Sequence, residues 1–262
     1  MTRIEKKFVA LKDAKKKGLV IYLMAGVPDA QGTIEAVKMA ERAGADFIEI
    51  GLLFSDPLAD GPVILAAGIR ALKGGMTLAG VLARVKEIRK FTEIPLIGMG
   101  YINNVLHYGA EKFVADAKAA GLDGAILPDV PHEESADLRE ICKKHDFRLI
   151  EFVTPGTTPD RLVQTCESAN GFIYAVSVNG VTGEKKIDYS IIGKVARKVR
   201  EQTETPIAVG FGIGSAEAAV DAAKDADAVI VGSAVVRRLM DGKMQEAEDF
   251  IASLRKALDA AC

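Results

Sequence analysis

After Asp46, three further carboxylates stand close together in residues 45–62, ADFIEIGLLFSDPLADGP. Glu49 interrupts a short apolar run, whereas Asp56 and Asp60 lie in the loop rich in Pro and Gly that follows. A strand-end ion pair would explain Glu49, because acids are rarely buried unless paired, and Asp beside Pro or Gly is ordinary in turns. Two carboxylates converging on one cleft can instead take separate acid and base roles if their surroundings push their pKa values apart. The segment suggests such chemistry without specifying it.

Two glycine-rich segments, GFGIGS (210–215) and VGSAVV (231–236), each end an apolar run and open a helical one. Glycine lets backbone N–H groups approach an anion, and a helix N-terminus adds a favourable dipole. Both segments could equally be tight turns that need glycine. GFGIG is not followed by the acid that completes a dinucleotide fingerprint about 20 residues on. The pair therefore predicts a site for a phosphate monoester.

A third polar segment, SVNGVTGEKK (177–186), is long for a connection between a strand and a helix. It could be a solvated loop or a lid that closes over a ligand and excludes water. Gly183 lies near enough to the preceding strand to help hold a phosphate. Tyr174, within that strand, would point either into the core of the fold or toward its helices.

Elements that could position these residues alternate regularly along the chain. Eight short, nearly continuous apolar runs bounded by Gly, Pro or Asp predict buried parallel strands. The runs are 19–25, 46–51, 95–100, 123–128, 148–153, 171–176, 206–212 and 227–232.

Segments of helical period separate these runs, with an extra helix in the first 16 residues and a terminal one at 244–260. Eight strands favour an α/β fold of the (β/α)8 TIM barrel type with an extra N-terminal helix, over an open doubly wound sheet. In a barrel, the active site lies where the strands end, which is where the unusual residues fall.

The composition indicates one globular domain over residues 1–262. Net charge is −2, which does not favour nucleic acid or an anionic membrane surface, and no apolar run reaches the ~20 residues of a membrane helix. Three cysteines, an odd number without metal-ligand spacing, suggest free thiols in a cytoplasmic protein. The histidines also lack metal-ligand spacing, so we expect no metal.

Five segments together resemble the tryptophan synthase α subunit family, in order from about residue 16 to 240. They are FIEIGLLFSDPLADGPVI, GAILPDVPHEES, IYAVSVNGVTGE, AVGFGIGS and DAVIVGSAVV. The resemblance implies a lyase that cleaves indole-3-glycerol phosphate to indole and glyceraldehyde 3-phosphate by a retro-aldol reaction, in L-tryptophan biosynthesis.

The resemblance also assigns residues position by position. Glu49 would move the protons at indole C3 and at the glycerol hydroxyl, Asp60 would take charge from the indole nitrogen, and Tyr174 matches the active-site tyrosine. Gly183, Gly212, Gly232 and Ser233 match the phosphate cradle, with Phe211 beside it, and Thr182 matches a lid threonine that contacts the Asp60 loop. Positions that line the indole pocket are matched by Tyr22, Met99, Tyr101 and Ile126.

In this family the α subunit binds a β subunit, which receives indole through a tunnel, in an α2β2 heterotetramer. The β subunit carries pyridoxal phosphate, so we expect no cofactor in this chain. Other readings are a stand-alone indole-3-glycerol phosphate lyase, another phosphate-binding barrel, or a barrel kept only to regulate a partner. The absence of Lys or His at the strand ends argues against the second of these, and intact Glu49, Asp60 and Tyr174 argue against the third.

Several positions depart from the family pattern. Leu52-Leu53 stands where the family usually has Ile or Val followed by Pro, and Asn104 also stands where proline is usual. Met24 replaces a frequent Thr, and Val178 lies where some members carry Arg. Proline fixes φ and lowers the entropy of the unbound loop, so its loss at Leu53 predicts a freer Asp60 loop. This loop faces the β subunit in the family, so we expect the changes to affect subunit coupling.

Overall fold

The computed structural model describes residues 1–176, 189–210 and 212–261, and its strands form one all-parallel sheet. Each of the eight predicted runs contains a strand, and the run 148–153 contains two. The strands are β1 (Gly18–Met24), β2 (Phe47–Gly51), β3 (Leu96–Met99), β4 (Gly124–Ile126), β5 (Arg148–Leu149), β6 (Glu151–Val153), β7 (Ile173–Val176), β8 (Ile207–Gly210) and β9 (Ala228–Val231).

The sheet closes on itself at the interruption between β5 and β6. The strand order is β5-β4-β3-β2-β1-β9-β8-β7-β6, so its two ends, β5 and β6, are separated only by Ile150. β5 pairs with β4, whereas β6 pairs with β7. One predicted strand therefore appears as two because it changes partner partway along. The prediction of a (β/α)8 barrel is confirmed, and the open sheet is excluded.

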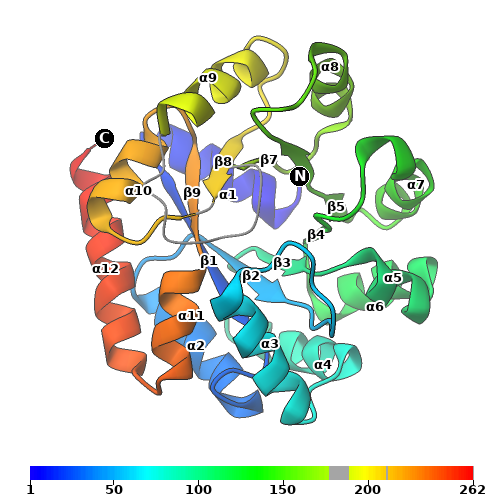
Figure 1. The fold of residues 1–262 in the computed structure, drawn as a ribbon, viewed down its shortest axis with the longest axis vertical. Helices are drawn as coiled ribbons and strands as arrows, with labels where there is room; N and C mark the ends of the chain where they lie inside the picture. Colours follow the sequence, from blue (N-terminus) through cyan, green and yellow to red (C-terminus); the bar gives the residue numbers. More distant parts are fainter. Residues whose placement is uncertain (177–188, 211, 262) are drawn as a thin grey trace.

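Helices surround the strands in Figure 1, and connect each strand to the next except β5 to β6. The predicted N-terminal and C-terminal helices are both present, as α1 and α12. The helices are α1 (Arg3–Asp13), α2 (Ala30–Arg42), α3 (Pro62–Lys73), α4 (Leu78–Ile88), α5 (Ile102–Tyr108), α6 (Ala110–Ala120), the 3-10 helix η1 (His132–Glu134), α7 (Ala136–Lys144), α8 (Pro159–Ser168), α9 (Tyr189–Arg200), α10 (Ala216–Ala223), α11 (Ser233–Met240) and α12 (Met244–Ala260).

The core has two parts, one between strands and helices and one inside the barrel. α1 buries Ile4, Phe8 and Leu11 in the inner part, against residues at the beginnings of the strands. The Phe8 ring lies 4.6 Å from that of Phe47 and 6.0 Å from that of Phe172. The extra helix thus closes the end of the barrel at which the strands begin, and the opposite end is left for the loops that carry the unusual residues.

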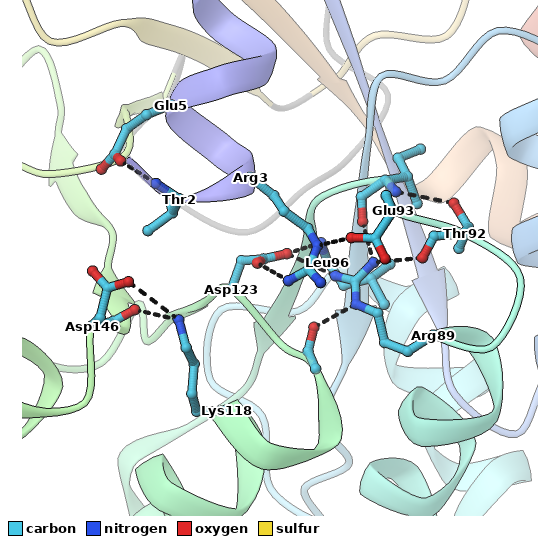
Figure 2. A network of polar contacts seen from close by, with 12 residues as sticks. Thr2, Arg3, Glu5, Arg89, Thr92, Glu93, Leu96, Lys118, Asp123 and Asp146 are labelled. Atoms are coloured by element: carbon cyan, nitrogen blue, oxygen red, sulfur yellow. Dashed lines mark hydrogen bonds and ion pairs between the residues drawn. The ribbon is translucent and has the colours of Figure 1, made fainter.

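A polar network fastens the closed end, as Figure 2 shows. Asp123 lies at the start of β4 and is 1% exposed. Its carboxylate accepts hydrogen bonds from Arg89 Nη2 at 2.7 Å, Arg3 Nη1 at 3.1 Å and the Leu96 backbone N–H at 2.9 Å. Arg3 belongs to α1, so this buried carboxylate joins the terminal helix to two strands and to the end of α4.

Among the described residues, no single helix has the length and hydrophobicity to span a membrane. Only α3 and α4 taken together meet those criteria, and they are bent by 96° relative to one another.

Candidate active site

Glu49 is a buried carboxyl group without a hydrogen-bond partner among the described residues. It lies in β2, with Tyr22 of β1 and Ile97 of β3 as its neighbours in register. Its side chain is 1% exposed, and neither oxygen is hydrogen-bonded. Burial raises its pKa to about 8, because removal from water disfavours the charged form. Glu49 is therefore mostly protonated at neutral pH and can donate a proton.

Two tyrosines share this part of the barrel with Glu49. Burial raises the pKa of Tyr22 well above its usual value, and the charges of Asp60 and Glu49 raise it further. Burial and then the charge of Glu49 do the same to the pKa of Tyr174. Both predicted catalytic carboxyls thus act on Tyr22. The structure brings them into one site from β2 and from the loop that follows it.

Tyr174 points into the barrel, which settles the choice that the sequence left open. Its side chain belongs to the inner core, and its ring stacks on Phe152 with centroids 5.2 Å apart. Its hydroxyl lies against the α-carbon of Gly210, where a Cβ atom would collide with it. Gly210 therefore makes room for the tyrosine that its neighbouring strand presents.

Asp60 is held by a tyrosine from the start of the next strand–helix loop. The Tyr101 hydroxyl donates a hydrogen bond to Asp60 Oδ1 at 2.8 Å, and the Tyr101 hydroxyl oxygen accepts one from the Ala59 N–H at 3.0 Å. Burial raises the pKa of Asp60, and the bond from Tyr101 opposes that rise. Asp56 is exposed and accepts from the adjacent Ser55, which is the ordinary turn chemistry that the sequence allowed.

Two of the positions that depart from the family pattern contact each other. Asn104 Nδ2 donates a hydrogen bond to the Leu53 carbonyl oxygen, so a side chain restrains the loop where proline is usual. Leu53 itself is buried. The sequence predicted a freer loop from the lost proline, without this compensating bond. Val178 lies outside the described residues.

Part of the predicted phosphate cradle lies directly after the ends of the neighbouring strands β8 and β9. Gly212 follows β8 with φ +70°, a left-handed conformation that favours glycine. Gly232 caps the N-terminus of α11, of which Ser233 is the first residue, and lies close to the Tyr22 side chain. The first N–H groups of a helix have no partner within it, so this end can bind an anion. Gly183, Thr182 and Phe211 fall outside the described residues.

The four residues expected to line the indole pocket come from β1, β3 and β4 and from the connection that follows β3. Tyr22 lies in β1, and Met99 of β3 is paired in register with Ile126 of β4. Ile126 is fully buried inside the barrel, with Met99 packed against it, and Tyr101 follows β3. Two of the four side chains are therefore apolar, and the other two are tyrosines, of which Tyr101 binds Asp60.

Sequence reasoning missed Asp129, which follows β4. Both of its carboxylate oxygens accept hydrogen bonds from the Ile102 N–H, at 3.0 and 3.1 Å, so it fixes the start of α5. An acid directly after a strand was the available signal, since Asp129 follows the run 123–128.

A cavity of about 310 Å³, also unforeseen, opens between the loop after β4 and β6. Its lining includes Leu127, Phe152 and Glu151. Glu151 is buried but satisfied, because Ser168 Oγ donates to it at 2.8 Å and Arg139 lies 3.6 Å away. Within the described residues, no cluster of three or more His, Cys, Asp or Glu side chains could hold a metal ion.

Comparison with known proteins gives concordant results over nearly the whole chain. The sequence profile of the tryptophan synthase alpha chain family matches residues 8–261. A chain from Aquifex aeolicus VF5 is 37% identical, with 98% of this chain and 99% of that one covered and a TM-score of 0.92. Tryptophan synthase subunit alpha from Legionella pneumophila is 34% identical, with 99% of each chain covered and a TM-score of 0.92. Mycobacterium tuberculosis tryptophan synthase is 32% identical, with 98% of each chain covered and a TM-score of 0.91.

Proposed function

Because this chain belongs to the tryptophan synthase alpha chain family, we propose that Glu49, Asp60 and Tyr174 carry the chemistry of that family in it. The reaction itself follows from membership: the chain is a lyase that cleaves indole-3-glycerol phosphate to indole and glyceraldehyde 3-phosphate, as an alpha subunit in tryptophan biosynthesis. The stand-alone lyase is not favoured.

The retro-aldol cleavage needs two proton transfers on one side of the substrate. A proton added to indole C3 gives an indolenine whose positive charge is shared with the ring nitrogen. Removal of the proton from the adjacent glycerol hydroxyl then forms the aldehyde carbonyl. The C3 bond breaks, and its electron pair returns to the ring to give indole. One proton enters and one leaves, so a single group can serve both steps.

Glu49 fits that double role. With its pKa at about 8, it is protonated at neutral pH and can supply the C3 proton, and the carboxylate that results can accept the hydroxyl proton. The position on a strand fixes the carboxyl group relative to the reacting carbon. Because the acid form starts the reaction, kcat/KM should fall as pH rises through about 8.

Asp60 fits the contact with the indole nitrogen. Its carboxylate already accepts a hydrogen bond from the Tyr101 hydroxyl, so it is placed to accept one from an indole N–H. A negative charge there balances the positive charge that protonation at C3 places on the ring. Tyr174 and Tyr22 supply buried hydroxyls near Glu49, whose charge acts on both. Gly212, Gly232 and Ser233 supply backbone N–H groups for the phosphate, with Gly183 and Phe211 assigned by resemblance alone.

The family implies a β subunit as partner, and we propose an α2β2 complex whose β subunit carries the pyridoxal phosphate. Alpha chains of this family need no cofactor of their own. Exposed apolar side chains support docking at the open end of the barrel: Leu58 is 83% exposed in the Asp60 loop, and Leu106 is 62% exposed in α5. A large apolar side chain left in water is typical of a surface that a partner covers.

We further propose that residues 1–262 act as one domain in the cytoplasm. The described elements share one closed sheet, and Cys142 and Cys166 are buried free thiols, as a reducing compartment allows.

The observation that carries the proposed residue roles is the buried Glu49 carboxyl, which has no hydrogen-bond partner in the part of the chain that the structure describes. Indole release from indole-3-glycerol phosphate should be measured for the purified chain with and without a tryptophan synthase β subunit. We expect slow release alone, strong stimulation by β, and a large but measurable fall in both activities in Glu49→Gln and Asp60→Asn. Fast release that is indifferent to β would support a stand-alone lyase instead. Full activity in Glu49→Gln would overturn its role.

A further inference from the structure

We propose that Asn104 is a positioning residue for Asp60, because its side-chain amide fastens the loop that carries Asp60 to the start of α5. The inference rests on the proposed function, in which Asp60 contacts the substrate. In this proposal Asn104 does not contact the substrate. It acts by fixing the place at which the Asp60 loop leaves the barrel.

The first contact is at the beginning of the loop. The last backbone bond that joins this chain segment to β3 runs from the Leu52 N–H to the Met99 oxygen, at 2.6 Å. Leu53 is the next residue, and its carbonyl accepts the hydrogen bond from Asn104 Nδ2. Leu53 is buried, so water cannot readily replace the amide as donor. Asn104 thus extends the fixed part of the chain beyond the end of the sheet.

The second contact is at the end of the same loop. The Tyr101 hydroxyl bonds to both Asp60 and Ala59, and the Tyr101 ring lies 5.5 Å from that of Phe54. Tyr101 and Asn104 are three residues apart, at the start of α5. One helical turn therefore holds the loop at both ends.

The two contacts differ in what happens when substrate binds. The Tyr101 bond uses the Asp60 carboxylate, which must accept from the indole N–H and so has to share or release the tyrosine. The Asn104 bond uses only the Leu53 backbone carbonyl, and can persist throughout. Asn104 is therefore the restraint that remains when Asp60 turns toward the ring nitrogen.

The helical turn is itself anchored from the other side. Asp129, after β4, accepts hydrogen bonds from the Ile102 N–H, and the Asn104 N–H bonds to the Tyr101 oxygen at 3.1 Å. A path of hydrogen bonds thus runs from the loop after β4, through α5, to the loop after β2. The position of the Asp60 loop therefore depends, through Asn104, on the loop that follows β4.

The test compares Asn104→Asp with Asn103→Asp in the full chain. Both variants add one negative charge at adjacent positions of α5, but Asn103 is exposed, and only at position 104 is the donor to Leu53 lost. We expect kcat/KM for indole release to fall about fivefold or more in Asn104→Asp, the ratio that one net hydrogen bond is worth. Asn103→Asp should stay within about twofold. Equal losses in the two variants would overturn the proposal.

A double-mutant cycle separates positioning from a general structural defect. If Asn104 acts through Asp60, then Asn104→Asp should cause no further loss in the Asp60→Asn background. Losses that simply multiply would show that Asn104 acts independently of Asp60, and would overturn the proposal.

Hydrogen exchange of the backbone amides in residues 53–60 tests the tether without using activity. Exchange should be about fivefold faster in Asn104→Asp than in the wild type and unchanged in Asn103→Asp. Unchanged exchange in Asn104→Asp would overturn the proposal. A wild-type chain that released no indole would refute the proposed function alone, since this exchange measurement would still decide whether Asn104 holds the loop.

Discussion

Glu49, midway along a barrel strand, and Asp123, at the closed end of the barrel, are equally buried carboxyl groups that differ in their partners. Each is 1% exposed. Asp123, at the closed end, accepts hydrogen bonds from two arginines and from a backbone N–H. Glu49, toward the open end, accepts none from the described residues. Burial removes both carboxyls from water. Among the described residues, only Asp123 gains hydrogen bonds that replace those to water.

This difference separates a structural acid from a chemical one. A buried charge that is paired and fully hydrogen-bonded fixes the elements around it. A buried carboxyl left without partners is costly to ionise, so it keeps its proton and is available to react with a ligand. Burial alone would therefore have classified Glu49 and Asp123 together, and the hydrogen-bond partners distinguish them.

The largest expected effect is a loss of activity on changing Glu49, the chemical acid of this comparison. Glu49→Gln keeps the size of the side chain but removes the transferable proton, so kcat/KM for indole release should fall by about a thousandfold or more. The variant should remain folded, because Glu49 makes no hydrogen bond to the described residues that the change could remove. Circular dichroism and urea unfolding check the fold. A variant that lost activity by unfolding would place Glu49 with Asp123 as a structural residue.

The next largest effect is a loss of stability on changing Asp123, the structural acid. Asp123→Asn should lower the free energy of unfolding by about 3 kcal/mol, because it leaves the buried Arg89 guanidinium without its counter-charge. The midpoint of urea unfolding measures this loss. At a temperature where the variant is folded, kcat/KM should match that of the wild type. A large loss of kcat/KM in a folded Asp123→Asn would show that the two ends are coupled.

A third test uses pH to follow the proton on Glu49. Its pKa is about 8 in the folded chain and near 4.5 when unfolded, so between these values the folded state binds more protons. Stability from Glu49 is therefore fully present below about pH 4.5 and is lost as pH rises to about 8. Relative to Glu49→Gln, the wild type should lose about 2 kcal/mol of unfolding free energy between pH 6 and pH 8. Parallel stability curves for the two proteins would contradict the raised pKa.

The sequence predicted the fold in considerable detail, because strand and helix periods are local properties. All eight predicted segments contain strands, and both extra helices are present. The split of 148–153 into β5 and β6 could not be predicted, since it arises where one strand exchanges β4 for β7 as its partner. That exchange depends on how the barrel closes.

The candidate site was predicted by residue type, but not by environment. Glu49 and Asp60 stood out because an acid in an apolar strand and another in the following loop are unusual. Asp123 looked like the boundary of a strand, because its partners Arg3 and Arg89 are distant in sequence. The bond between Asn104 and Leu53 was likewise hidden, since it joins α5 to the loop after β2. Such contacts require the folded arrangement.

The smallest expected effect sharpens the comparison by dividing the network at the closed end. Arg3 joins α1 to Asp123, but its side chain is 36% exposed and Asp123 keeps Arg89 when Arg3 is changed. Arg3→Met should therefore cost only about 1 kcal/mol of unfolding free energy, and salt should reduce the difference from the wild type. Urea unfolding at low and high salt measures both. If Arg3→Met cost as much as Asp123→Asn, the satisfied carboxylate would depend on the helix that closes the barrel. The difference between Asp123 and Glu49 would then come mainly from the position of α1. The partners that the rest of the barrel gives each acid would matter less.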